Sequence, residues 1–513
     1  MKKLYTLLLA SVALTTSCNS LDLEPESTIT DANYWKSDDQ FTAFAAGCNT
    51  SFRNHSWNFY LYGEARADVF AGTPFGGEAQ QGMENLYYNS LTTTSTVIGN
   101  YGGMYNTINQ LNMLIAKSEE NTTLPEATRA FYKGMGYGMR AYLYFHLLRS
   151  YGDAIVTTDY TSGSSLDLSN LSRPQDSAAN VLSQIKSDLE NSEKAFSGNY
   201  AFTKGKYYWS LAATEMLKGE VYLWSAKQAG GSSADLATAK TALENIKALE
   251  GKSLNLLDKY TDVFAFGKKN NDEIIFSLYS GENEYTMCGG SFFSNCVPQQ
   301  TYLTNGSYFD ENGVSFKENE DKTLSGLIRL PSNTALSTEL YLPGDSRKAA
   351  NVRDVYTKDA NGDLQYLACF PYKWQGTMIS GASTRSAYND WIVYRYADAV
   401  LLLAEVKAAL GEDITDEINK IRKRAYGANY DESTMGYPND TRVTSLTGSD
   451  EDPVEAVLKE RFRELIWEGH RWYDIRVEGK TGKYSSAIDS RLLWPIDQST
   501  LTNNSGLEQT AGY

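Results

Sequence analysis

The sequence predicts a mainly α-helical protein with one long, loop-rich part between two helical blocks. In both blocks apolar residues recur every three or four positions, which is the period of an amphipathic helix. Between them, residues 256–390 show few such periods and many glycines, asparagines, serines and aromatic residues. The chain of 513 residues exceeds the usual size of a single hydrophobic core. We therefore divide it into an N-terminal helical part (37–255), the loop-rich part (256–390) and a C-terminal helical part (391–513).

Residues 1–17 are typical of a bacterial export signal that ends at a lipidated cysteine. A basic start precedes a short apolar run at residues 4–14, and small polar residues then lead to Cys18. The apolar run is too short to cross a bilayer. Leu14 lies four residues before Cys18, where a spacing of about three is commoner, so ordinary signal-peptidase cleavage nearby is the alternative. We expect Cys18 to carry the lipid and the acidic residues 18–36 to form a tether.

Apart from Cys18 the chain has four cysteines, which are Cys48, Cys288, Cys296 and Cys369. Four cysteines in an exported protein permit disulfides with three possible connectivities, and Cys288 with Cys296 would close a short loop. None of them has the spacing or the histidine neighbours of a zinc site. No metal site is therefore expected from the cysteines.

The N-terminal part carries the clearest helical periods. Its first helix begins near Ser37, where Ser37 or Asp38 can cap it, and places Phe41 and Cys48 on one face. Further helices are expected at residues 96–118, 124–152, 175–195, 207–227 and 235–249. The helix at 124–152 contains small residues at positions 134, 136, 138 and 141. Each helical glycine destabilises by roughly 0.5–1 kcal/mol relative to alanine, so we expect close helix packing to be the reason for them.

In the loop-rich part the sequence predicts one strand, Glu273–Ser280, and a polar loop at 305–325. Two short runs, Asp310–Gly313 and Asp359–Asp363, are similar to calcium-binding loops, but neither has the EF-hand spacing. Asp or Asn before Gly more often forms a simple turn. We therefore expect turns and no cofactor, with structural calcium as the alternative. A loop-rich insertion between helical blocks is where binding residues usually lie.

In the C-terminal part, helical periods resume at Trp391 and run to Gly411, and a second helix at residues 414–425 completes an αα-hairpin. A further helix begins at Asp452–Glu455, which offers an N-cap, a first-turn proline and a capping-box glutamate, and Gly469 closes it. Antiparallel helix pairs with small residues where they meet indicate a tetratricopeptide-like array, although no strict repeat of about 34 residues is visible.

The densest polar stretch of the chain is Lys459–Lys480. Acids and bases that alternate on its helix, such as Glu460 and Arg461, favour ion pairs with one another or with nearby helices. His470 follows a helix-ending glycine, where the negative helix end favours a proton donor. A catalytic Glu468–His470 pair is the alternative, but no nucleophile or metal ligand is organised nearby. We expect a structural framework here.

Several stretches of the chain, in order, resemble segments of the SusD/RagB family. These segments are Cys18–Asn19, Arg140–Phe145, Tyr151–Asp153, Tyr394–Asp398, Leu402–Glu405, Ile418–Arg422, Glu460–Leu465, Glu468–Arg476, Leu493–Ile496 and Gly512–Tyr513. Two small departures are Ile155–Val156 and Ile466–Trp467. Members of this family are outer-membrane nutrient-binding lipoproteins of Bacteroidetes.

The resemblance implies a fold, a site and a partner. The implied fold has about four tetratricopeptide-like helix pairs and a variable, loop-rich part that carries the ligand site and few short strands. The implied partner is a SusC-like TonB-dependent barrel transporter, which the protein covers as a lid, and two such pairs commonly associate. The implied location is the surface of the outer membrane, with the N-terminal lipid as the anchor.

Three loops are the predicted ligand site, because aromatic faces stack on sugar rings while Asp, Arg and Gln side chains bind hydroxyl or peptide groups. For each residue, plain packing is the alternative. The candidates are Asp68, Phe70 and Tyr87 in the first loop, Tyr285, Gln300 and Tyr302 in the second, and Tyr372, Trp374, Arg385, Tyr388 and Trp391 in the third.

Composition narrows the range of possible ligands and partners. A net charge of −16 argues against nucleic acid as a partner, and 36 tyrosines with 9 tryptophans favour ligands such as sugars or peptides. We predict a non-enzymatic cell-surface lipoprotein that binds an oligomeric nutrient, a glycan by default, and delivers it to the barrel transporter. An oligopeptide ligand, a carbohydrate hydrolase and a protein-interaction scaffold are the alternatives.

Overall fold

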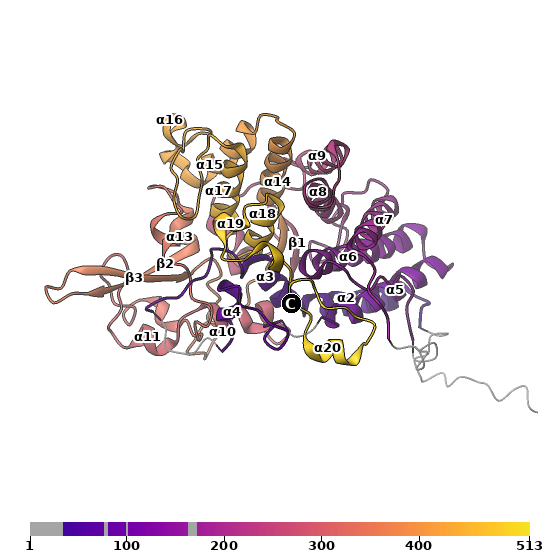
Figure 1. The fold of residues 1–513 in the computed structure, drawn as a ribbon, viewed down its shortest axis with the longest axis horizontal. Helices are drawn as coiled ribbons and strands as arrows, with labels where there is room; N and C mark the ends of the chain where they lie inside the picture. Colours follow the sequence, from indigo (N-terminus) through magenta and orange to yellow (C-terminus); the bar gives the residue numbers. More distant parts are fainter. Residues whose placement is uncertain (1–33, 76–80, 99–100, 163–171) are drawn as a thin grey trace, which may run out of the picture.

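A computed structural model describes residues 34–75, 81–98, 101–162 and 172–513, and helices predominate in it (Figure 1). The N-terminal part contains α2 (Asp38–Arg53), α3 (Ser56–Glu64), α4 (Glu84–Tyr87), α5 (Gly103–Glu120), α6 (Glu126–Tyr151), α7 (Ala178–Phe196), α8 (Leu211–Gln228) and α9 (Ser233–Lys247). The predicted lipidation site Cys18 lies outside the described residues. None of the described helices is long and apolar enough to cross a membrane.

The loop-rich part has only short helices. They are η1 (Tyr260–Val263), η2 (Phe266–Lys268), η3 (Met287–Gly290), α10 (Ser291–Cys296), α11 (Gln300–Thr304), η4 (Glu320–Thr323), α12 (Ala335–Thr338) and α13 (Arg347–Asn351). The C-terminal part contains α14 (Tyr396–Ala409), α15 (Thr415–Tyr426), η5 (Gly427–Asn429), α16 (Glu432–Met435), α17 (Pro453–Leu465), α18 (Arg471–Val477), α19 (Thr481–Tyr484), η6 (Asp489–Arg491) and α20 (Gln498–Asn503).

The longer helices form one continuous array. In chain order α5 packs on α6, α6 on α7, α7 on α8 and α8 on α9, and the array then continues directly from α9 to α14 and from α14 to α15 and α17. The whole loop-rich part lies between α9 and α14 in sequence, so it is an insertion that leaves the helix array unbroken. The prediction of a mainly helical, tetratricopeptide-like fold with few short strands is confirmed.

Close helix packing explains the glycines of α6, as predicted. A Cβ atom at Gly134 would lie 2.7 Å from the ring of Phe196, and one at Gly136 would lie 2.6 Å from Ile115. A Cβ atom at Gly138 would lie 2.0 Å from the indole nitrogen of Trp209. Neighbouring elements therefore approach α6 closely at these three glycines, and an alanine at any of the three positions would clash with them.

Helix starts agree with the sequence in most places. Ser37 caps α2 in a complete capping box with Gln40, and Asp452 caps α17 through the backbone N–H of Val454. Glu455 is not a capping-box residue as predicted, because its carboxylate accepts hydrogen bonds from Tyr484 and Lys483 instead. The helix predicted at 96–118 begins only at Gly103.

The helix predicted to start at Trp391 begins five residues later. Residues Trp391–Arg395 form strand β4, which pairs antiparallel with β1 (Ile274–Leu278), placing Leu278 opposite Trp391 and Ile274 opposite Arg395. All five residues of each strand are buried. A continuously apolar run that is buried on both faces has no period of two, so it is easily read as the first turn of the following helix.

A second hairpin was not predicted. Strands β2 (Val352–Lys358) and β3 (Leu364–Pro371) pair antiparallel and project from the body of the molecule at the left of Figure 1. The turn expected at Asp359–Asp363 joins them, and the Asp359 carboxylate accepts hydrogen bonds from the backbone N–H groups of Asn361 and Asp363. The Asp310 carboxylate closes its own turn in the same way, through Asn312 and Val314.

The suggested Cys288–Cys296 disulfide is not present in the structure. Both thiols are free and buried, as are Cys48 and Cys369. Burial raises the pKa of the Cys288 thiol, which keeps it protonated and unreactive. These four cysteines therefore act as small apolar core residues.

Candidate ligand-binding face

The stretch Lys459–Lys480 forms a buried network of ion pairs. The guanidinium of Arg395 lies 2.6 Å from the Glu464 carboxylate, 2.8 Å from Glu468 and 2.8 Å from Glu273. Arg347 lies 2.7 Å from Glu460. These side chains come from β4, α13 and α17, from the residue directly before β1 (Glu273) and from the turn after α17 (Glu468), so the network joins the loop-rich part to the helix array. The expected framework is confirmed in its geometry.

The alternative of a catalytic Glu468–His470 pair has no support in this geometry. The Glu468 carboxylate forms ion pairs with Lys373, at 2.6 Å, and with Arg395, at 2.8 Å. Burial alone would raise the pKa of Glu468, but these two cations lower it, and a carboxylate with a lowered pKa is a poor base. The backbone N–H of His470 donates to Glu64, 3.0 Å away. Both residues are therefore held as structural elements.

The network should make the protein sensitive to acid. Burial raises the pKa of Glu460, but the guanidinium groups of Arg347, Arg422 and Arg463 outweigh it and lower the pKa to about 2. Because this pKa lies below the unfolded value near 4.3, the stabilisation is fully present above about pH 4.3 and is lost as the pH falls toward 2. The difference corresponds to roughly 3 kcal/mol.

We therefore expect the free energy of unfolding, measured in urea, to fall steeply between pH 4.3 and pH 2. Glu64, whose pKa burial raises to about 7, titrates above this window. The Glu460→Gln variant should be less stable at pH 6 and should lose less between pH 4.3 and pH 2. An equal pH dependence in both proteins would contradict the role of Glu460.

Five of the predicted ligand residues lie in the interior. Asp68 forms a bidentate ion pair with Arg471, at 2.8 and 2.9 Å, and the ring of Phe70 packs on Trp467. Trp374 donates its indole N–H to the Trp467 carbonyl, and Trp391 packs between Trp374 and Tyr60. Tyr87 is also buried, against its neighbour Tyr88. These five side chains serve the packing of the interior, which was the alternative to ligand binding.

Tyr285 lies apart from the other candidates. Its ring stacks under the guanidinium of Arg53, 4.4 Å away, and its hydroxyl donates to the Arg53 carbonyl at 3.0 Å. Tyr388 is half-buried. Neither makes a described contact with the cluster below.

The structure brings the remaining candidates together around η4. The Gln300 amide donates to the Lys322 carbonyl at 3.1 Å, and Arg385 donates to the Thr323 hydroxyl at 2.9 Å. The Tyr372 hydroxyl donates to Asp321 at 2.8 Å. Burial and the Asp321 carboxylate raise the pKa of Tyr372 to about 12, so its hydroxyl remains a neutral donor.

Two further aromatic rings lie on α11 and shortly after it. The rings of Tyr302 and Tyr308 are half-buried and rest on the buried ring of Phe75, with centroids 5.7 and 4.9 Å away. Tyr88 is 59% exposed, and its hydroxyl lies 3.2 Å from the position that a Cβ atom at Gly72 would take. We name the surface formed by Tyr88, Gln300, Tyr302, Tyr308, Thr323, Tyr372 and Arg385 the loop face.

The loop face can bind a ligand by stacking and hydrogen bonding. The phenol hydroxyls of Tyr302 and Tyr308 have no hydrogen-bond partner within the part of the chain that the structure describes. Aromatic faces with free hydroxyls and a guanidinium nearby suit polar molecules that also have apolar surfaces. The described ranges contain no group of three or more His, Cys, Asp or Glu side chains placed to hold a metal ion.

Sequence reasoning missed Tyr88, Tyr308 and the η4 segment that anchors the face. Tyr88 directly follows the predicted Tyr87, and nothing in the local pattern tells which of the two rings is buried and which is exposed. Asp321 and Thr323 lie in the polar loop at 305–325, where nothing in the pattern marks a contact across to Arg385 or Tyr372.

Two family models match the chain. One described as "SusD family" matches residues 273–490, and one described as "Starch-binding associating with outer membrane" matches residues 24–217. The structure of B. fragilis NanU is 48% identical, covers 96% of this chain and 100% of that chain, and superposes with a TM-score of 0.90.

Two further proteins show the same likeness. A SusD superfamily protein from Bacteroides vulgatus is 45% identical over 93% of this chain and 100% of that chain, with a TM-score of 0.89. SusD-like protein P38 of Formosa agariphila is 26% identical over 99% of this chain and 98% of that protein. This chain therefore belongs to the SusD/RagB family.

Proposed function

We propose that the protein is a cell-surface lipoprotein that binds an oligomeric glycan on the loop face. The observation that carries this proposal is the loop face itself. Its Gln300 and Arg385 both bond η4, and the half-buried ring of Tyr302, on the same short helix as Gln300, packs with Tyr308 on Phe75. Family membership supports it, since one matching family is described as starch-binding. The acidic and basic side chains of Lys459–Lys480 and of the two Asp turns are held by structural partners, which favours binding over catalysis as the function.

Delivery to a SusC-like barrel transporter is the second part of the proposal. The family model described as associating with the outer membrane supports this location. The lipid on Cys18 would hold the protein at the membrane, and the acidic tether would let it cover the transporter as a lid. Isolation of the protein from solubilised outer membrane tests this part, and recovery without a large barrel protein would favour the scaffold alternative.

Removing two rings of the loop face should weaken glycan binding. We expect the Tyr88→Ala/Tyr302→Ala variant to bind neutral oligosaccharides from starch and β-glucan at least about tenfold more weakly, because each stacked ring contributes roughly 0.5–1.5 kcal/mol. Calorimetry with the pure protein measures the affinity, and analysis of the recovered sugar detects any hydrolysis.

The matched control is Tyr430→Ala, which removes a half-buried tyrosine two residues before α16. In Figure 1 α16 lies at the top left, whereas α11 lies at the lower left. It should bind as the unaltered protein does. Equal affinity of the loop-face variant and the control would contradict the proposed site. Binding of oligopeptides but not of glycans would favour the peptide alternative, and turnover of the sugar would favour a hydrolase.

A further inference from the structure

A second group of partly exposed aromatic rings shares no residue with the loop face. Phe266 on η2 is 44% exposed, and Tyr279, directly after β1, is 37% exposed. The ammonium group of Lys269 lies between them, 5.1 Å from the ring centroid of Phe266 and 4.9 Å from that of Tyr279. We name Phe266, Lys269, Tyr279, Tyr207 and Asp390 the aromatic clamp.

A buried carboxylate holds the clamp together. One oxygen of Asp390 lies 2.8 Å from the Lys269 ammonium and accepts the backbone N–H of Ser280 at 3.0 Å. Its other oxygen accepts the Tyr207 hydroxyl at 2.8 Å. The Tyr207 ring in turn packs edge-on against Tyr279, with centroids 5.4 Å apart. Lys269 and Tyr279 are therefore fixed in place before any ligand arrives.

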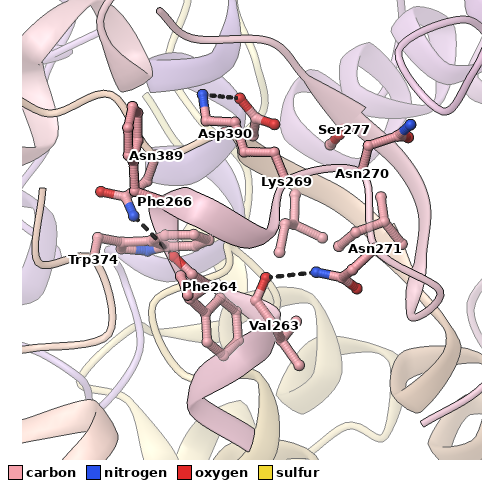
Figure 2. A pocket seen from close by; sticks show the side chains of 13 residues that line it. Val263, Phe264, Phe266, Lys269, Asn270, Asn271, Ser277, Trp374, Asn389 and Asp390 are labelled. Atoms are coloured by element: carbon pink, nitrogen blue, oxygen red, sulfur yellow. Dashed lines mark hydrogen bonds and ion pairs between the residues drawn. The ribbon is translucent and has the colours of Figure 1, made fainter. Parts of the chain in front are cut away.

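The floor of the clamp is closed. The cavity behind it has a volume of about 20 Å³, which is room for about one water molecule, and Trp374 and Phe264 line its inner end (Figure 2). Asn389 donates to the Phe264 carbonyl and Asn271 to the Val263 carbonyl, as Figure 2 shows. A ligand must therefore lie across the outer faces of the rings and cannot enter behind them.

The charges of the clamp select a neutral ligand. The charge of Lys269 is matched by Asp390, and both oxygens of Asp390 already accept hydrogen bonds. What the surface offers is two partly exposed aromatic rings. The Lys269 ammonium between them donates to Asp390 and to the Ser280 carbonyl, which leaves one of its three N–H groups. Phe266 and Tyr279 are both partly exposed on either side of one ammonium group, and an apolar patch of more than one such side chain is a candidate binding site.

From this geometry we infer that the aromatic clamp is a second glycan-binding site, which takes a neutral sugar ring by stacking on Phe266 and Tyr279. This inference rests on the proposed function, because it assigns the same class of ligand. The clamp shares no residue with the loop face, so a long glycan can bind at both sites, whereas a short one occupies one of them. Two linked contacts strengthen binding of the long chain without any new interaction.

Glycans of two lengths separate the two sites. The probes are soluble starch and laminarin in native gels, and their trisaccharides in calorimetry. The polysaccharide that slows the unaltered protein in the gel should also slow the Phe266→Ala/Tyr279→Ala variant, but only at about tenfold higher polysaccharide concentration. The affinity of the remaining loop-face site for the trisaccharide should stay within about twofold, because the loop face is intact in this variant. The Phe266→Tyr variant keeps a stacking ring and should behave as the unaltered protein.

The control is Val443→Ala, which removes another exposed apolar side chain (67% exposed) and should change neither measurement. Thermal unfolding of all variants shows whether they are folded. Unchanged retardation of the Phe266→Ala/Tyr279→Ala variant, with weaker binding by the loop-face variant, would overturn the clamp and leave the proposed function standing. If the unaltered protein binds neither polysaccharide nor any neutral trisaccharide, the proposed function fails and the clamp fails with it.

Discussion

Replacing Gly63 by alanine should prevent stable folding. A Cβ atom at this position would lie 1.7 Å from the carbonyl oxygen of Gly469 and 2.5 Å from its carbonyl carbon. That turn cannot move aside, because the neighbouring Glu64 carboxylate accepts the backbone N–H groups of Trp467, Gly469 and His470. Overpacking a core usually costs about 1–3 kcal/mol, and a clash between two backbones should cost more. Urea unfolding followed by tryptophan fluorescence measures the loss.

Gly47→Ala is the matched control for this prediction. Gly47 lies in the exposed face of α2, and a Cβ atom there would meet nothing within 4 Å. Alanine favours a helix over glycine by roughly 0.5–1 kcal/mol, so this variant should unfold at a slightly higher urea concentration. If Gly63→Ala unfolds at the same urea concentration as the unaltered protein, then α3 does not approach the turn at Gly469 as closely as described.

Replacing Arg395 by methionine should destabilise the protein by about 3–5 kcal/mol. The variant keeps the volume of the side chain but leaves the buried carboxylates of Glu273, Glu464 and Glu468 with one cation fewer. Removing one partner of a buried ion pair is expensive, because the remaining charge stays out of contact with water. Since the network joins β1, β4 and α17, unfolding should remain a single cooperative transition.

Lys423→Met is the control for the network. Lys423 lies 3.7 Å from Glu432, and both side chains are mostly exposed. An exposed pair of this kind contributes about 0–1 kcal/mol, so its loss should hardly move the urea midpoint. A similar effect of the two substitutions would show that the Arg395 network contributes no more than a surface ion pair.

The sequence predicted the helices because each depends on signals within one segment. The capping box at Ser37, the N-cap at Asp452 and the apolar period of α6 all act over a few residues. The first strand of the buried pair, β1, was also predicted, within Glu273–Ser280. Strand β4 was not, because pairing with β1 across more than one hundred residues decides its conformation, and no local pattern records that pairing.

The same division between local signals and long-range contacts holds for the candidate site. The sequence identified the loop-rich part and the residue types, and Gln300, Tyr302, Tyr372 and Arg385 do lie together. It could not separate Trp374 and Trp391, which are buried, from Phe266 and Tyr279, which are exposed. An aromatic residue has the same local pattern in either place, since only the neighbours packed against it decide whether its ring meets water.

The sequence by itself determined the family, the helix array and the structural role of Lys459–Lys480, because helix periods, caps and signature residues are local and specific. The tertiary structure alone decided which charges pair with that stretch, where β1 meets β4, and which aromatic rings remain exposed. Each of these depends on contacts between residues that are far apart in the chain. The packing of whole helices and strands against one another decides such a contact. The local sequence around either of the two residues does not contain that information.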